Sequence, residues 1–444
     1  MAEILKTLRK YNIYNFTLTI DKNKILHLFF LIIIAIILEY RYISFVHVEY
    51  ERFNFTLNFN FLRLFVGKTL FIFSFLLFFI KQTKFIYFST LSLNLFLLLP
   101  NIIIYQYTNA PISIVLLILF LLFLLSSNIF DLTKINAIKN IQERKIIFIK
   151  DKLKLPILLS LSLLFLLPFI ISYGFNIDFR VFTFSEIIYD IREKASLLSN
   201  IFTNYLYSPL SNFILPILII FGIIKKKWQY VIFGIIAMTY LYAIIPQKGT
   251  FMGIGIILIF YFFNDFNKKI SFFLTTITVL LIATIFFTNF LHIDMPESIF
   301  IRRLFFIPAV LNNAYFEIFN SNHIHLSHSI LRYFIDYPYS VEPPFYVSKI
   351  FWGMPSDANN GIISDGFMNF GIIGSIIEII IATIILKFID LLNISYRFLG
   401  VMYMIIRLFI SGALLTSLLT HGLLLLFLIL ILFLKGTNNE TIEI

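Results

Sequence analysis

The sequence contains no cysteine, and only 13% of its 444 residues are charged. The absence of cysteine excludes disulfide bonds, thiolate nucleophiles and cysteine-ligated metals. The scarcity of charge is unusual, because a soluble domain carries about 25% charged residues. Hydrophobic residues make up 59% of the chain. A water-soluble fold could not bury so much apolar surface, so we conclude that lipid is part of the protein's solvent.

The apolar runs are long and do not alternate with polar residues, as in LFFLIIIAIIL and LLLLFLILILFL. Only helices and closed barrels satisfy their backbone hydrogen bonds in hydrocarbon. The strands of a barrel would alternate over about ten residues. The sequence therefore predicts an all-α, polytopic integral membrane protein, with residues 1–444 forming a single membrane domain.

A spanning helix needs about 20 apolar residues, or fewer where the bundle shields its ends. About twelve segments meet this requirement, although the eighth is short. The predicted spans are 25–45, 61–80, 85–104, 112–130, 155–173, 207–224, 228–245, 250–263, 270–290, 369–386, 398–416 and 422–434. The N-terminal region lacks the pattern of a cleaved signal peptide, so we expect the first span to remain.

Lysine and arginine are concentrated in alternate connections between these spans. If the N-terminus is cytoplasmic, the inward segments carry twice as many of these residues as the outward segments, as the positive-inside rule requires. An even number of spans then returns the C-terminus to the cytoplasm. The net charge of +11 is thereby explained by topology. We expect membrane lipids, and not nucleic acid, as partners of the basic loops.

Two outward segments, 174–206 and 291–368, are long. Loops of this length are usually functional or disordered. Both mix apolar and polar residues, and the larger one contains helix-like stretches such as SIFIRRLFFIPAVLNNAYFEIF. We expect short re-entrant or interfacial helices in this larger segment.

Three arginines of these segments, Arg192, Arg302 and Arg303, are candidate ligands of a phosphate-type anion. Guanidinium groups bind phosphates with bidentate, charge-assisted hydrogen bonds, although interfacial arginines also extend to lipid headgroups. The adjacent pair Arg302 and Arg303 interrupts an apolar stretch, where two cations need an anionic partner. Lys248, in the short outward loop IIPQKGT, is a fourth candidate. It would face a cavity or lie in a plain turn.

The segment NSNHIHLSHS groups His323, His325 and His328. Metal binding is disfavoured, because the spacing matches no zinc pattern and no carboxylate lies at motif spacing. A neutral imidazole can instead accept a proton from a hydroxyl group. His325 and His328 are therefore candidate bases, with ordinary loop histidines as the alternative, and we predict no metal site.

The stretch DANNGIISDGFMNFGIIG, residues 357–374, gathers four glycines, three asparagines and two aspartates at the mouth of a span. Asn359, Asn360 and Asn369 are predicted to bind a sugar or a phosphate. Asp365 is the first candidate for a catalytic base. The alternative explanation is an N-cap and a turn ahead of the span.

The glycines of this stretch have two predicted roles. Gly361 and Gly366 are expected to let the backbone turn tightly and come close to its neighbours. Gly371 and Gly374 are expected to allow close packing of helices. Trp352, just before the stretch, is predicted to bind a glycan.

Five segments in order carry a family resemblance: FSEIIYDIREK, YLYSPLSNFILPILIIFGIIKKK, YAIIPQKGT, FIRRLFFIPAVLNNAYFEIF and ANNGIISDGFMNFGIIGSII. Over roughly residues 180–385 the chain resembles the Wzy-type polymerases of O-antigen and capsule repeat units. By position, Arg192 looks like the arginine of the family's first large periplasmic loop. Arg302 or Arg303 looks like that of the second. The glycine that well-known members carry eleven positions after each arginine is absent here.

The resemblance implies an enzyme of the bacterial inner membrane with its site on the periplasmic face. Its substrates would be undecaprenyl-pyrophosphate-linked glycans, and the growing chain would be transferred to the non-reducing end of a new unit. The four cationic residues would then bind pyrophosphate. No cofactor is expected, since the sequence has no Walker loop or dinucleotide fingerprint. A chain-length-regulating membrane protein and a flippase are the expected protein partners.

Other classes share parts of this pattern. An O-antigen ligase would transfer the lipid-linked glycan to lipid A–core, and SHSIL at 327–331 partly matches its family. A lipid-linked oligosaccharide flippase would also have twelve spans and basic inner loops, but its outer loops are normally short. A polysaccharide exporter or scaffold, or a transferase using a single lipid-phosphate sugar with VEYER at 48–52 as its acidic motif, remain further alternatives.

Overall fold

The computed structural model describes residues 21–132, 149–175, 177–183, 187–247, 255, 257–354 and 356–435. Every regular element in these residues is a helix, which confirms the all-α class. Eight helices are long and apolar enough to cross a membrane: Lys22–Phe53, Phe61–Phe79, Lys84–Tyr107, Asp151–Tyr173, Ile201–Ile224, Phe266–Leu291, Ile362–Leu391 and Leu414–Leu434. The chain therefore has the helices of a polytopic membrane protein.

The count of twelve spans and the large periplasmic loop stay predictions. Two shorter apolar helices, α8 (Ile112–Ser126) and α14 (Trp228–Ile244), coincide with predicted spans. A third helix, α21 (Leu399–Ser411), lies within the predicted span 398–416. The predicted span 250–263 lies partly outside the described residues.

The described residues belong to two compact units. Unit 1 comprises 1–139 and 274–390, and unit 2 comprises 140–273 and 391–444. Of the predicted site residues that the structure describes, Arg192 belongs to unit 2 and all others belong to unit 1. The single membrane domain stays a prediction.

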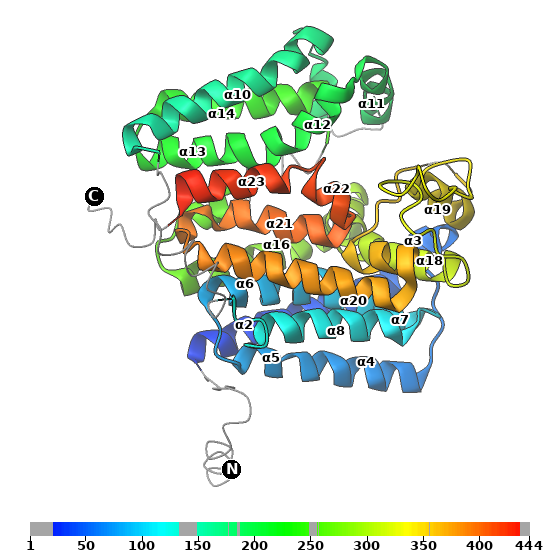
Figure 1. Cartoon of the computed structure of the whole chain (residues 1–444). Helices are drawn as coiled ribbons and strands as arrows, with labels where there is room; N and C mark the ends of the chain where they lie inside the picture. The colour runs from blue at the N-terminus through cyan, green and yellow to red at the C-terminus, as the bar shows by residue number, and fades with distance from the viewer. Residues whose placement is uncertain are drawn as a thin grey trace. The chain divides into compact units, whose positions relative to one another are not determined.

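Unit 1 contains most of the N-terminal helices and the α20 region (Figure 1). Its complete α-helices are α2 (Lys22–Arg41), α3 (His47–Tyr50), α4 (Phe61–Ser74), α5 (Leu76–Phe79), α6 (Lys84–Leu93), α7 (Leu99–Tyr107), α8, α17 (Met295–Glu297), α18 (Ile307–Ile318) and α19 (Pro343–Trp352). α20 (Ile362–Leu391) ends at the boundary of unit 1, and α16 (Phe266–Leu291) crosses it. Shorter turns η1 (Tyr42–Val46), η2 (Glu51–Phe53), η3 (Asn94–Leu98) and η7 (Ser298–Phe306) connect them.

Polar side chains set the start of several of these helices. Asp21, Asn60 and Thr83 each accept a hydrogen bond from a backbone N–H in the first turn of α2, α4 and α6, respectively. Such a cap stabilises a helix by about 1 kcal/mol, because it satisfies an N–H that has no partner within the helix. The stretch 85–107, from α6 to α7, is buried throughout, and α4, α8 and α18 pack against α7.

The helix α2 shows how the apolar sequence divides between protein and lipid. One set of its side chains is buried (Leu28, Leu31, Ile34 and Leu38), and another is exposed (Ile25, Phe29, Ile32 and Ile36). Both sets recur at helical spacing and both are apolar. In water the exposed set would be unfavourable, whereas in a bilayer it is the surface that lipid requires.

Unit 2 is built largely from apolar helices. Its α-helices are α10 (Asp151–Tyr173), α11 (Ile187–Leu198), α12 (Ile201–Pro209), α13 (Leu215–Ile224), α14, α21, α22 (Leu414–Leu418) and α23 (Leu423–Ile429), with η5 (Phe179–Thr183), η6 (Leu210–Ile214), η8 (Tyr396–Phe398) and η9 (Leu430–Leu434). α13 and α14 pack together as neighbours in sequence, and α10 packs against both.

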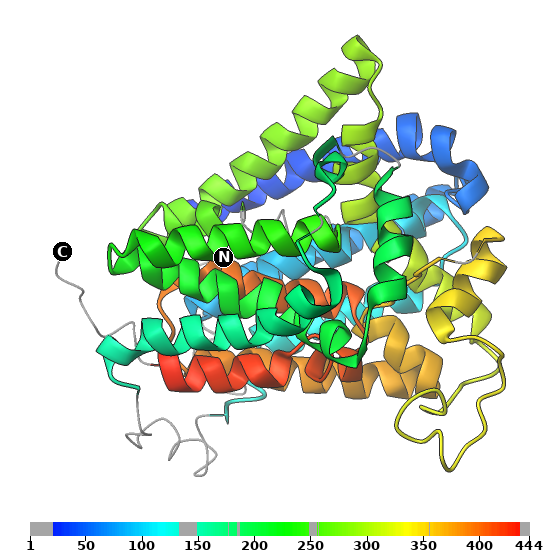
Figure 2. The ribbon, with the colours of Figure 1, turned by 90° about the horizontal axis from the view of Figure 1, so that it is seen from above.

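Segment 291–368 is structured along most of its length. After α16 it forms α17, η7 and α18, then an irregular stretch at 319–342, and then α19. Figure 2 shows the irregular stretch, in yellow, beside the beginning of α20. Trp352 at the end of α19 donates its indole N–H to the Phe53 carbonyl at 3.1 Å. The segment is thereby fixed to the end of the first helical span.

Candidate functional site

The polar stretch 357–374 contains the first arm and the turn of a helical hairpin within α20 (orange in Figure 1). The backbone leaves helical geometry at Phe370 (φ −142°) and Gly371 (φ +64°), so residues 362–369 form one arm and 372–391 the other. The Oγ of Ser375 donates to the carbonyl of Ile363 at 2.7 Å. Residues twelve apart would lie about 18 Å apart along a straight helix, so the second arm folds back along the first.

Two glycines allow the arms to touch. An ideal Cβ on Gly366 would lie 2.5 Å from the carbonyl carbon of Gly374, and one on Gly374 would lie 2.0 Å from the carbonyl oxygen of Gly366. No side chain fits at either position. The close packing predicted at Gly374 is confirmed, and Gly366 makes the close backbone approach expected of it, whereas the turn falls at Gly371. Gly371 makes the turn, because its φ of +64° favours glycine, and Gly366 makes the close contact.

Asp365 lies inside the hairpin and is only 3% exposed. Its Oδ1 accepts from the Nδ2 of Asn369 at 3.3 Å and of Asn360 at 3.5 Å. The same Nδ2 of Asn369 donates to the Asp365 carbonyl at 3.0 Å. The structure therefore brings together three residues that the sequence nominated. Amide donors around a buried carboxylate favour its ionised form.

The histidine segment is held against this hairpin by its backbone. The N–H groups of Ile324 and His325 donate to the carbonyls of Met368 and Asn369, at 3.0 and 3.2 Å. The N–H of Leu326 donates to the side-chain oxygen of Asn369 at 2.9 Å. His325 and Leu326 have positive φ values of 49° and 58°, a strained geometry that the surrounding contacts must enforce. Asn369 thus joins the histidine segment to Asp365.

The three histidines occupy different environments. His325 is exposed and its ring lies 5.5 Å from that of Phe370, between centroids. Burial lowers the pKa of His328, and burial together with the neighbouring His325 lowers the pKa of His323. The Nδ1 atoms of His323 and His328 are buried and have no hydrogen-bond partner among the described residues. These two imidazoles are therefore neutral near pH 7, as an acceptor of a proton must be.

Sequence reasoning missed a ladder of small polar residues behind the hairpin. The Oγ of Ser364 donates to Asn312 at 2.8 Å, and the Nδ2 of Asn312 donates to Asn101 at 3.3 Å. All three side chains are buried. They come from α20, α18 and α7, so the ladder fixes the first arm of the hairpin to the centre of unit 1. Asn312 lies in the quoted stretch FIRRLFFIPAVLNNAYFEIF, but its partner is 211 residues away in sequence.

Glu378 also lies at the site, and no catalytic role was predicted for it from the sequence. It lies on the second arm of the hairpin, and a side-chain hydrogen bond joins its carboxyl group to that of Asp365. Its Oε2 is buried and has no hydrogen-bond partner among the described residues. A carboxyl group in this position is costly in a membrane protein and is usually functional.

The paired arginines lie on η7, which leads directly into α18. Arg302 is half-buried; its guanidinium group lies 4.0 Å from the ring centroid of Tyr50 and donates to Ser298 Oγ at 2.9 Å. Arg303 is exposed. At the start of η7, Glu297 forms a fully buried ion pair with Arg41 of α2, with Nη2 and Oε2 2.6 Å apart. No spacing in the sequence indicates this pair, because its members are 256 residues apart.

The remaining predicted residues are more dispersed. Arg192 of α11, in unit 2, donates its Nε–H to the Pro246 carbonyl at 2.8 Å. Lys248 lies outside the described residues. Asn359 is exposed, and the indole N–H of Trp352 is used by the Phe53 carbonyl. The assignments of these residues to pyrophosphate and glycan stay predictions.

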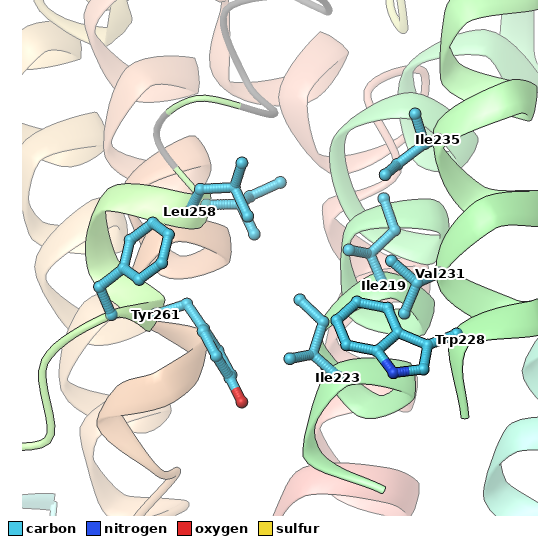
Figure 3. Close-up of a pocket in the computed structure, with 9 residues that line it drawn as sticks. Ile219, Ile223, Trp228, Val231, Ile235, Leu258 and Tyr261 are labelled. Atoms are coloured by element: carbon cyan, nitrogen blue, oxygen red, sulfur yellow. The ribbon is translucent and has the colours of Figure 1, made fainter. Parts of the chain in front are cut away.

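Unit 2 contains an apolar cavity of about 240 Å³, shown in Figure 3. Ile219, Ile223 and Val231 line one side, and Leu258 and Tyr261 the other. Such a lining can accommodate hydrocarbon, but it offers no group that would bind phosphate or sugar. Among the described residues, no cluster of three histidine or acidic side chains could hold a metal ion. No protein-family model matches the chain, and no match was found among curated proteins or solved structures.

Proposed function

We propose that this protein is a membrane-embedded glycosyltransferase that polymerises lipid-linked oligosaccharide repeat units. The observation that supports it most is the buried carboxylate of Asp365, held by Asn360 and Asn369 inside a helical hairpin. Amide groups and a carboxylate bind sugar hydroxyls, and the carboxylate can accept a proton from one of them. The adjoining histidine segment adds two neutral imidazoles.

In the proposed reaction, a hydroxyl at the non-reducing end of a new repeat unit attacks the anomeric carbon of the growing chain. The bond between that carbon and the pyrophosphate oxygen breaks, and the hydroxyl proton passes to Asp365. The leaving group is undecaprenyl pyrophosphate. Its negative charge calls for cationic groups, a role that we propose for Arg302 and Arg303, with Arg192 and Lys248 as the further candidates from the sequence.

The proposal includes a place and an orientation. The protein would lie in the bacterial inner membrane with both termini in the cytoplasm, so that segment 291–368 faces the periplasm. The lipid-linked substrate would be supplied there by a flippase, and a second membrane protein would set the chain length. The apolar cavity between α13, α14 and residues 257–262 is large enough for part of a lipid chain.

A gene-deletion strain tests the proposal through its surface glycan. Loss of a polymerase leaves lipid A–core capped with a single repeat unit. Loss of a ligase leaves bare core while long lipid-linked chains accumulate, and loss of a flippase leaves bare core with single lipid-linked units on the cytoplasmic side. Either of the last two patterns would refute polymerisation.

A flippase is the second candidate, and one observation favours it. Transporters place ionisable groups within their bundles as proton carriers, and the hydrogen-bonded carboxyls of Asp365 and Glu378 form such a group. The same pair is also consistent with a transferase in which Asp365 is the base. The location of the stranded lipid-linked units in the deletion strain separates the two functions.

A further inference from the structure

The two arms of the hairpin bring two carboxyl groups together. Asp365 lies on the first arm and Glu378 on the second, and a side-chain hydrogen bond joins them. The contact between Gly366 and Gly374 keeps the arms too close for a side chain to separate them. This arrangement is fixed further by the hydrogen bond from Ser375 to Ile363.

Two ionised carboxylates cannot form this contact. A hydrogen bond between carboxyl groups requires a proton on one of them. Two negative charges in such contact would also repel each other strongly in a medium of low dielectric constant. Groups in this situation take up one proton between them.

The neighbours of each carboxyl indicate which one carries the proton. Asp365 accepts hydrogen bonds from two side-chain amides, Asn360 and Asn369, which stabilise a negative charge. Glu378 has a buried Oε2 with no partner among the described residues. An unpartnered oxygen is less costly in a neutral carboxylic acid than in a carboxylate, because less charge is desolvated.

We propose that Asp365 and Glu378 share one proton that resides on Glu378, and that Glu378 donates it in a hydrogen bond to the Asp365 carboxylate. Glu378 is then a positioning residue, which holds Asp365 ionised and oriented. Among the described ionisable groups, Tyr315 of α18 interacts electrostatically with Asp365 and donates to the Ala358 carbonyl at 2.9 Å. His323 and His325 belong to the segment whose backbone is held at Asn369. Burial raises the pKa of Tyr315, so it stays neutral.

Infrared spectroscopy of the full chain in detergent tests where the proton lies. The carbonyl stretch of a protonated carboxylic acid is separate from the bands of carboxylates and shifts on exchange into heavy water. The difference between the wild type and Glu378→Gln should contain one such band. The matched control Glu317→Gln, which removes an exposed acid from α18, should contain none. A wild-type spectrum without this band, or a band that disappears in Asp365→Asn and persists in Glu378→Gln, would overturn the proposal.

A second measurement links the pair to the proposed function, on which this part rests. Glutamine mimics the neutral acid and keeps a hydrogen-bond donor, so Glu378→Gln should retain chain growth. Glu378→Ala should lose chain growth, although the variant protein is folded and present in the membrane in a comparable amount. Loss of chain growth in Glu378→Gln would show that Glu378 does not act as a neutral positioning residue. If the deletion phenotype instead excludes polymerisation, the infrared spectra still test the location of the proton, because they do not depend on activity.

Discussion

Two helical hairpins in this molecule are built on opposite plans. The pair α13 and α14 in unit 2 is apolar along its buried sides, and the residues that connect its helices are the exposed lysines of the sequence KKK. The hairpin of α20 in unit 1 buries Asp365, Asn369 and Ser364 along its first arm. Both hairpins pack a glycine closely against the facing helix.

The difference separates a structural hairpin from a candidate site. Burying apolar side chains in a membrane protein costs little, since the bilayer is equally apolar. Burying a carboxylate and several amides is costly unless every group is paired. The second hairpin retains these groups and satisfies most of them with other side chains. Its first arm is therefore where we expect substitutions to affect chemistry as well as stability.

The largest effect is expected from Asp365→Asn. The substitution preserves the size of the side chain but removes the proton acceptor, so chain growth should fall by about 10²- to 10⁴-fold, the usual contribution of a general base. Glycan ladders and transfer rates with purified lipid-linked units measure this. Asp336→Asn, at an exposed acid of the irregular segment, should leave the rate unchanged. Normal ladders from Asp365→Asn would remove this residue from the chemistry.

A comparably large effect is expected from Arg41→Gln, but on the stability of the protein and not on its activity. Arg41 and Glu297 are both buried, and the substitution leaves the Glu297 carboxylate without its partner. Breaking a buried pair in this way costs about 3–5 kcal/mol. The double variant Arg41→Met with Glu297→Met should recover most of the loss, because no unpaired charge remains. Chemical unfolding in detergent measures both variants, and a single variant as stable as the wild type would contradict the buried pair.

The exposed ion pair of Arg180 with Asp178 in unit 2 is the matched comparison. Its Nη2 and Oδ2 lie 2.6 Å apart, but the arginine is 63% exposed. Solvent screens such a pair. We therefore expect Arg180→Gln to unfold at the same denaturant concentration as the wild type, in contrast to Arg41→Gln.

A smaller effect is expected from substituting the glycines at which the hairpins touch. In Gly374→Ala the new Cβ would meet backbone, the Gly366 carbonyl oxygen, so the arms must separate. Overpacking of this kind costs about 1–3 kcal/mol. In Gly234→Ala the new Cβ would meet the Ile219 side chain of α13 at 2.6 Å, which can adjust its rotamer. Equal losses of unfolding free energy in the two variants would show that the α20 arms are no more tightly joined than α13 and α14.

The sequence predicted the helices and the region of the site better than the contacts within it. Long apolar runs are enough to predict spanning helices, because hydrocarbon leaves the backbone few other choices. The polar composition of 357–374 nominated Asp365, Asn360 and Asn369, which the structure brings into contact, and their roles stay predictions. It could not show the reversal at Gly371, because a Gly-x-x-Gly sequence is compatible with both a packed helix and a turn.

Contacts between residues that are distant in sequence could not be predicted. Asn101 with Asn312, and Arg41 with Glu297, are each separated by more than 200 residues. A single sequence contains no signal for such pairs, since each residue alone is an ordinary feature of its helix. The partner of Glu378 depends on the hairpin, which the composition does not reveal.

The smallest effect is expected from pH acting on the histidine segment. Burial lowers the pKa of His328 from its ordinary value of 6.5, so the folded state resists its protonation. The unfolded state gains the proton first as the pH falls below 6.5, and unfolding becomes more favourable. Stability contributed by the neutral ring is complete above that value and decreases as the pH falls toward the lowered pKa. Limited proteolysis of segment 319–342 between about pH 7.5 and about pH 5.5 should therefore become faster, and less so in His328→Gln. In His47→Gln, which changes a histidine of α3, the acceleration of proteolysis should match that of the wild type. If His328→Gln shows the same acceleration as the wild type, groups other than His328 cause the effect.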